Sequence, residues 1–104
     1  MARPLVIVFA RAPRYGAVKR RLAREIGAAE SLRFYRTVLT GLMRRVRDDA
    51  RWETVLCITP DAAARECGLW PLRATAQGFG DLGRRMVRAL REAGTRPAVV
   101  VGSD

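Results

Sequence analysis

An unbroken apolar run near the amino end constrains the fold of this chain most. Residues 5–9 are all apolar, and the three at the centre are β-branched. Such a short run is typical of a strand buried on both faces, as strands of parallel sheets are. A turn-rich segment over 10–17 follows, and then a basic segment with helical character from Val18. A strand, a glycine-containing basic loop and a helix in this order predict an anion site beyond the carboxyl end of the strand.

Strand-like and helix-like segments alternate along the rest of the chain. We predict strands over 54–59, 72–75 and 97–101, helices over 18–26, 29–48 and 82–93, and a helical turn over 62–66 capped by Asp61. This alternation implies right-handed crossovers and a parallel sheet with helices on both faces. We expect one domain over residues 1–104. No predicted helix follows the last strand, so we also expect the chain to be part of a longer α/β protein.

The composition is that of a globular chain, with 49% hydrophobic residues. No apolar run approaches the roughly 20 residues of a membrane span, and the first strand is followed by Arg11 without a cleavage pattern. We therefore expect a cytoplasmic protein with no membrane partner. The chain has no histidine, which excludes ordinary Cys-His zinc sites and Ser-His catalysis. Cys57 lies within a predicted strand and is interpreted as buried and inert.

The net charge of +10 raises the possibility of a nucleic-acid partner. All but one of the twenty basic residues are arginine, however, and they are spread over the whole chain. This spread indicates solvated helix faces and argues against nucleic acid as the main partner. The single lysine, Lys19, lies at the junction of the first loop and helix. A compact ammonium group there suits a closely held phosphate.

A second glycine cluster matches the dinucleotide pattern G-x-G-x-x-G at Gly78, Gly80 and Gly83, and Asp104 ends the next predicted strand. Two features weigh against a dinucleotide site. The preceding segment LRATAQ is polar for a central strand, and Asp81 would place a carboxylate beside the pyrophosphate. The alternatives are a flexible loop before a helix capped by Asp81, or a loop that closes over a base or ribose.

Asp104 is the best metal candidate, because it follows Gly102 and Ser103 at a strand end. Magnesium is often held by one or two carboxylates together with substrate phosphates. The alternative is an ordinary turn residue at the end of a strand.

Four segments in order, FARAPRYGAVKRRL, CITPD, QGFGDLGRRM and VVVGSD, resemble a bacterial family of glycosyltransferase-like proteins of the GT-A fold. Its members are often called radical-SAM/selenodomain-associated transferases, and they are related to nucleotide-diphospho-sugar transferases. The resemblance implies a Rossmann-like three-layer α/β/α fold of GT-A type. Members of the family are longer, so this chain is expected to be the N-terminal, nucleotide-binding half of such a domain.

The same resemblance implies roles for individual residues. Arg11, Gly16 and Lys19 would lie at the phosphates of a nucleotide, Gln77, Gly78 and Asp81 near the nucleoside, and Asp104 at Mg²⁺ or Mn²⁺. The expected activity is glycosyl or nucleotidyl transfer from a nucleotide or nucleotide-sugar donor to an unknown acceptor. A dinucleotide-binding module and an Arg-rich nucleic-acid binder remain the alternatives. An unpaired sheet edge is also expected, with possible self-association.

Overall fold

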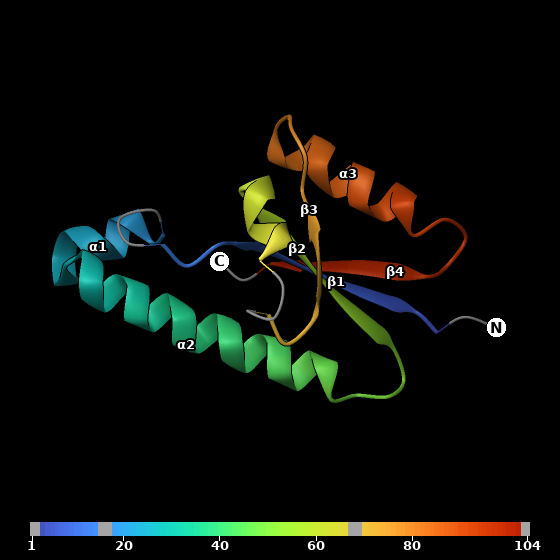
Figure 1. The fold of residues 1–104 in the computed structure, drawn as a ribbon, viewed down its shortest axis with the longest axis horizontal. Helices are drawn as coiled ribbons and strands as arrows, with labels where there is room; N and C mark the ends of the chain where they lie inside the picture. The colour runs from blue at the N-terminus through green and yellow to red at the C-terminus, as the bar shows by residue number, and fades with distance from the viewer. Residues whose placement is uncertain (1–2, 15–17, 67–69, 103–104) are drawn as a thin grey trace.

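The computed structural model describes residues 3–14, 18–66 and 70–102. Within them a four-stranded sheet lies between two helical layers, with α2 below and α3 above it in Figure 1. The elements are β1 (Leu5–Arg11), α1 (Arg20–Ile26), α2 (Ala28–Arg47), β2 (Glu53–Thr59), the 3₁₀ helix η1 (Asp61–Arg65), β3 (Arg73–Ala76), α3 (Leu82–Glu92) and β4 (Ala98–Gly102). The predicted three-layer α/β arrangement is confirmed.

The strands are all parallel and lie in the order β3-β2-β1-β4. The register pairs Leu5 with both Glu53 and Ala98, so β2, β1 and β4 start nearly level with one another. The chain first moves outward from β1 to β3, and α3 then carries it back to the other side of β1. The strand order therefore reverses between β1 and β4.

The central strand β1 is buried on both faces, as its apolar run predicts. Val8 and Ala10 pack in a core with Tyr35, Leu39 and Met43 of α2. On the opposite face, β1 residues Leu5, Ile7 and Phe9 pack with Cys57, Ala89 and Ala93. Alternate residues of one strand thus fill both cores, because successive side chains of a strand point to opposite faces.

Local signals explain where the helices begin and end. Gly27, with φ of +91°, separates α1 from α2 and adopts a conformation that residues with a side chain rarely take. Asp81 caps α3, because its carboxylate accepts a hydrogen bond of 2.8 Å from the backbone N–H of Arg84. This confirms the predicted cap.

Most predicted element ends differ from the observed ones by one or two residues, and two local predictions differ for a specific reason. The first helix begins at Arg20 and not at Val18, because Lys19 adopts a left-handed conformation (φ +48°, ψ +50°) that a helix cannot continue through. Asp61 does not cap the helical turn that it begins. Its carboxylate accepts a 3.0 Å hydrogen bond from the backbone N–H of Gly78 instead, which ties η1 to the loop after β3.

The outer edges of the sheet are β3 and β4. Among the described residues no strand pairs with the outer side of β4, where Val99 is 51% exposed. Self-association through this edge stays a prediction. Within the described ranges, no helix has the length and apolar character needed to cross a membrane.

Candidate nucleotide site

The carboxyl ends of β1 and β4 point to the left in Figure 1, toward α1. Ligands of open parallel sheets bind beyond this edge, where the strand order reverses. In this chain the reversal lies between β1 and β4. Two pockets lie beside the end of β1, and Arg11 lines both of them.

The first pocket lies on the α1 side and has a volume of about 730 Å³. Four basic residues line it, together with Phe34 and Tyr35. The basic residues are Arg11, Lys19, Arg20 and Arg21. Among the described residues, no carboxylate lines this pocket. Its chemistry therefore favours an anion with a flat or apolar part.

The position of Lys19 is fixed through its backbone. The single hydrogen of the buried Ser31 hydroxyl is shared between the carbonyls of Lys19 (3.0 Å) and Val18 (3.4 Å). These bonds link the start of α1 to α2. The left-handed backbone of Lys19 is thus held by tertiary contacts, and its half-buried side chain lines the pocket.

The second pocket lies on the α3 side, between the ends of β1, β2 and β4, and has a volume of about 290 Å³. Arg11, Thr59 and Gly102 line it from the strands, and Gln77, Arg85 and Met86 from the other side. Among the described residues, no carboxylate lines this pocket either. The end of β1 therefore lies between two cationic pockets.

The predicted nucleoside-side residues lie on the loop between β3 and α3. Gln77 is 4% exposed, and its side-chain amide donates to the carbonyls of Ala10 (3.0 Å) and Cys57 (3.1 Å). It therefore anchors the loop to the ends of β1 and β2. Gly78 has a φ of +82°, a conformation that residues with a side chain rarely adopt, and a side chain there would also displace the guanidinium of Arg88.

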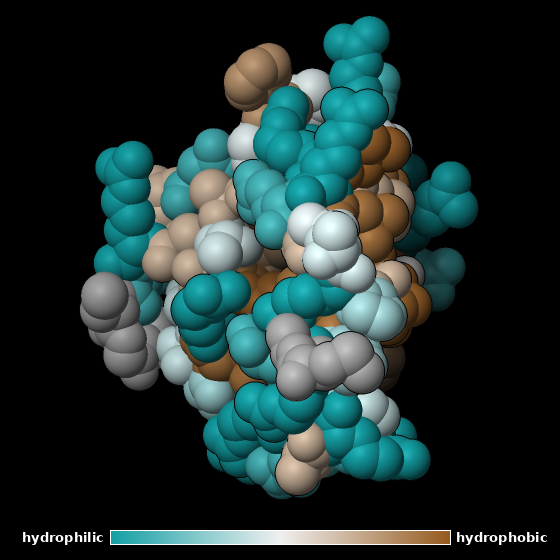
Figure 2. Space-filling model, turned by 90° about the vertical axis from the view of Figure 1, so that its right-hand side faces the viewer, coloured by the Kyte–Doolittle hydropathy of each residue, from teal (hydrophilic) through white to brown (hydrophobic). Residues whose placement is uncertain are grey.

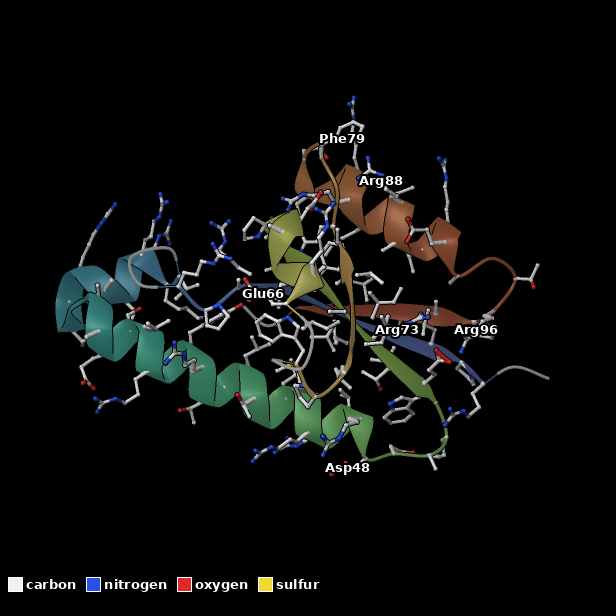
Figure 3. The ribbon with its side chains drawn as sticks, in the orientation of Figure 1. Asp48, Glu66, Arg73, Phe79, Arg88 and Arg96 are labelled. Carbon is white, nitrogen blue, oxygen red and sulfur yellow. The ribbon has the colours of Figure 1, made fainter. Side chains whose placement is uncertain are left out.

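The tip of this loop carries an exposed aromatic ring. Phe79 is 84% exposed, and the guanidinium carbon of Arg88 lies 4.7 Å from the centre of its ring. The two side chains lie together above α3 in Figure 3. Arg88 also donates 3.0 Å hydrogen bonds to the carbonyls of Gln77 and Phe79. Cation–π contact and hydrogen bonds together hold the loop in one shape.

Gly16 and Asp104 lie outside the described residues, so the predicted phosphate glycine and metal acid stay predictions. Among the residues that are described, no three His, Cys, Asp or Glu side chains gather as a metal cluster. Cys57 is buried, as expected, and burial raises the pKa of its thiol above the ordinary value. It faces the α3 core and has the character of an inert packing residue.

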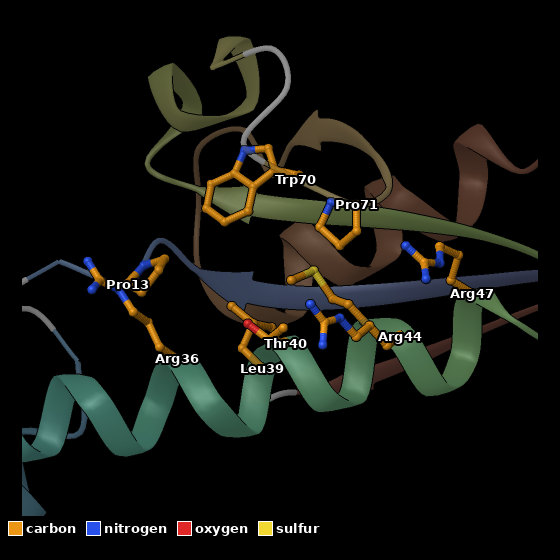
Figure 4. Close-up of a pocket in the computed structure, with 9 residues that line it drawn as sticks. Pro13, Arg36, Leu39, Thr40, Arg44, Arg47, Trp70 and Pro71 are labelled. Atoms are coloured by element: carbon orange, nitrogen blue, oxygen red, sulfur yellow. The ribbon is translucent and has the colours of Figure 1, made fainter.

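A third groove runs along α2 from Pro13, just beyond the end of β1, to the segment that leads into β3 (Figure 4). It has a volume of about 670 Å³ and is lined by Arg36, Arg44 and Arg47 on one side and by Trp70 and Pro71 on the other. Figure 2 shows hydrophilic residues also spread over the end of the molecule where the strands begin. Basic residues are thus not confined to the candidate site.

Fold and site together define a Rossmann-like α/β protein with a cationic crevice at the reversal of its strand order. The chain belongs to the family described as "Uncharacterized protein conserved in bacteria (DUF2064)", whose profile matches residues 42–104. A comparison with curated proteins found no match.

A solved structure has a similar fold. It is described as a "putative nucleotide-diphospho-sugar transferase" from Desulfovibrio desulfuricans G20, with a TM-score of 0.86 and 24% sequence identity. The match covers 100% of this chain and 48% of that protein, so this chain spans about half its length. The likeness confirms the predicted Rossmann-like fold.

Two residues of the crevice were missed by the sequence analysis. Arg85 is one of nineteen arginines, and nothing in its local pattern separates it from its neighbours. Tyr35 received no functional role from the sequence pattern, and its hydroxyl proves to bind the backbone of Arg11. Neither residue has a local signal, because Tyr35 and Arg85 are brought to the end of β1 only by the fold of the chain.

Proposed function

We propose that this chain binds the diphosphate of a nucleotide or nucleotide-sugar donor, as part of a transferase of the glycosyl or nucleotidyl type. The observation that carries the proposal is the pair of cationic pockets on either side of the end of β1, with no carboxylate among their described lining residues. The α3-side pocket is lined by residues of both β1 and β4, between which the strand order reverses, and nucleotides bind at such a reversal in parallel α/β sheets.

Arg11 and Lys19 would hold the phosphates, with Gly16 allowing close approach of the loop. Positive charge at these positions offsets the negative charge that develops on a departing nucleotide or diphosphate. Such transfer depends mainly on positioning and electrostatics, which suits a chain without histidine. The loop of Gln77, Gly78 and Asp81 would lie near the nucleoside, and Gln77 would anchor this loop to β1 and β2.

The proposal includes a divalent cation, Mg²⁺ or Mn²⁺, with Asp104 as its protein ligand. The described residues alone supply no cluster of three metal ligands, so the cation would depend on Asp104 and on phosphate oxygens of the donor. When bound, it would neutralise charge on the diphosphate.

The dinucleotide alternative meets a structural difficulty. The glycines of the pattern follow β3, an edge strand, whereas a dinucleotide fingerprint follows a central strand of its sheet. The carboxylate of Asp81 also caps α3, so it lies at the helix start where a dinucleotide fingerprint would place the pyrophosphate.

Thermal unfolding with added ligands tests the proposal. Nucleoside diphosphates and nucleotide sugars with Mn²⁺ are compared with NAD and with a short RNA. A ligand present at about 100 times its Kd stabilises by about 2.7 kcal/mol, which raises Tm by several degrees in a domain of this size. We expect this from at least one nucleoside diphosphate or nucleotide sugar. Stabilisation by NAD alone, or only by RNA with steep salt dependence, would overturn the proposal.

A further inference from the structure

The amide of Gln77 has a fixed orientation. Its nitrogen donates to the carbonyls of Ala10 and Cys57, which uses both of its hydrogens. Its oxygen is therefore the atom that faces α3, where it accepts a short hydrogen bond from Nη1 of Arg85. The opposite orientation would place the amide oxygen against two carbonyl oxygens. Gln77 thus offers a buried acceptor to one guanidinium.

Arg85 is held at two places. Besides the bond to Gln77, its Nε donates to the carbonyl of Asp81 at 3.4 Å. In the part of the chain that the structure describes, no carboxylate forms an ion pair with Arg85, whereas the neighbouring Arg84 lies 3.9 Å from the carboxylate of Asp81. Arg85 is half-buried and lines the α3-side pocket together with Arg11. Two arginines thus line one small pocket, without an acidic residue among its described lining residues.

We propose that the α3-side pocket is a phosphate subsite, in which Arg85 binds the phosphate and Gln77 orients Arg85. The planar guanidinium suits this role, because a phosphate can accept two parallel hydrogen bonds from it. The inference rests on the proposed function for the source of the ligand, which is the diphosphate of the donor nucleotide. A free phosphate ion has the same chemistry and is the second source to be tested.

The test measures binding by calorimetry to the wild-type chain and to three single variants. Inorganic pyrophosphate, inorganic phosphate and the nucleoside diphosphate that stabilises the protein best are the probes. Arg85→Met removes the guanidinium, Arg85→Lys keeps its charge, and Arg84→Met is the matched control one residue away on the same helix. Circular dichroism and thermal unfolding confirm that each variant is folded.

We expect Arg85→Met to weaken pyrophosphate and nucleoside diphosphate binding about tenfold or more, since a hydrogen bond to a charged group contributes about 1.5–3 kcal/mol. Arg85→Lys should recover part of this loss and Arg84→Met should bind as the wild type does. A dependence on Arg85 that is equal for inorganic phosphate supports the subsite with a single phosphate as its ligand. Equal affinities of the Arg85→Met and Arg84→Met variants would overturn the inference and leave the proposed function intact. A wild-type chain that binds none of the probes would overturn both.

The positioning role of Gln77 needs a readout beyond stability. If Gln77 acts through Arg85, the Gln77→Met variant weakens binding, and the double variant with Arg85→Met binds no more weakly than Arg85→Met alone. Additive losses in binding would contradict this role. The thermal stability of Gln77→Met should fall in either case, because the carbonyls of Ala10 and Cys57 lose a donor.

Discussion

The hydroxyl of Tyr35 binds both polar backbone groups of Arg11. It accepts from the Arg11 N–H at 2.9 Å and donates to the Arg11 carbonyl at 2.6 Å. The pairing of β1 with β4 ends at Phe9 and Gly102, so the last residue of β1 has no partner there among the paired residues of β4. A side chain from α2 therefore completes the hydrogen bonding of the strand end that carries the site.

Tyr35→Phe should destabilise the fold by about 1–3 kcal/mol, since two partly buried backbone groups lose their partner while the ring remains packed. Urea unfolding followed by circular dichroism measures this change. The control is Thr37→Ala on the same helix, whose exposed hydroxyl bonds only within α2 and should matter by less than about 0.5 kcal/mol. Equal effects of the two substitutions would contradict the special role of the Tyr35 hydroxyl.

Lys19 combines a left-handed backbone with a positive charge, and two substitutions separate these properties. Lys19→Gly and Lys19→Ala both remove the ammonium group, so both should weaken nucleotide binding to the same extent. The glycine variant should unfold at higher urea concentration, with about 1 kcal/mol greater stability than the alanine variant, because a left-handed backbone costs alanine more. Different affinities of two equally folded variants would show that backbone shape, and not charge, governs binding.

The side chain of Asp81 should act as a hydrogen-bond acceptor and not through its charge. Asp81→Ala should cost about 1 kcal/mol by removing the cap of α3, whereas Asp81→Asn should be nearly neutral. The exposed ion pair with Arg84 is long, at 3.9 Å, and adds little. Urea unfolding of both variants checks this, and an equal loss from Asn and Ala would favour a charge effect.

The sequence predicted most of the fold because its signals are local. The apolar run of β1 and the cap at Asp81 each need only a few neighbouring residues. The residues of the site were harder to predict from the sequence. Gln77 stands in a polar loop and is buried only because the ends of two other strands supply carbonyls for its amide. The prediction that Asp61 caps a helical turn was wrong for the same reason, since its carboxylate accepts from the N–H of Gly78, which lies beyond β3.

Asp49 should make stability depend on pH in the acidic range. Hydrogen bonds from the side chain and backbone of Arg51 lower the pKa of Asp49 to about 2. A carboxyl group whose pKa is lower in the folded chain stabilises it above the unfolded pKa, near 4, and loses this contribution as pH falls towards 2. Asp49→Asn should therefore be less stable than the wild type at pH 6, with the difference closing between about pH 4 and 2. Parallel stability curves from pH 6 to 2 would contradict this.

We propose that a nucleotide diphosphate binds at the end of β1 and not at other arginine-rich surfaces such as the groove along α2. The most direct measurement is calorimetric titration of the wild type, Lys19→Met and Arg44→Met with nucleoside diphosphates and Mn²⁺. Arg44 lines the groove along α2, away from the strand ends, and is the matched control. We expect Lys19→Met to weaken binding about tenfold and Arg44→Met less than about twofold. Equal losses from both variants, or no binding to the wild type, would contradict the account.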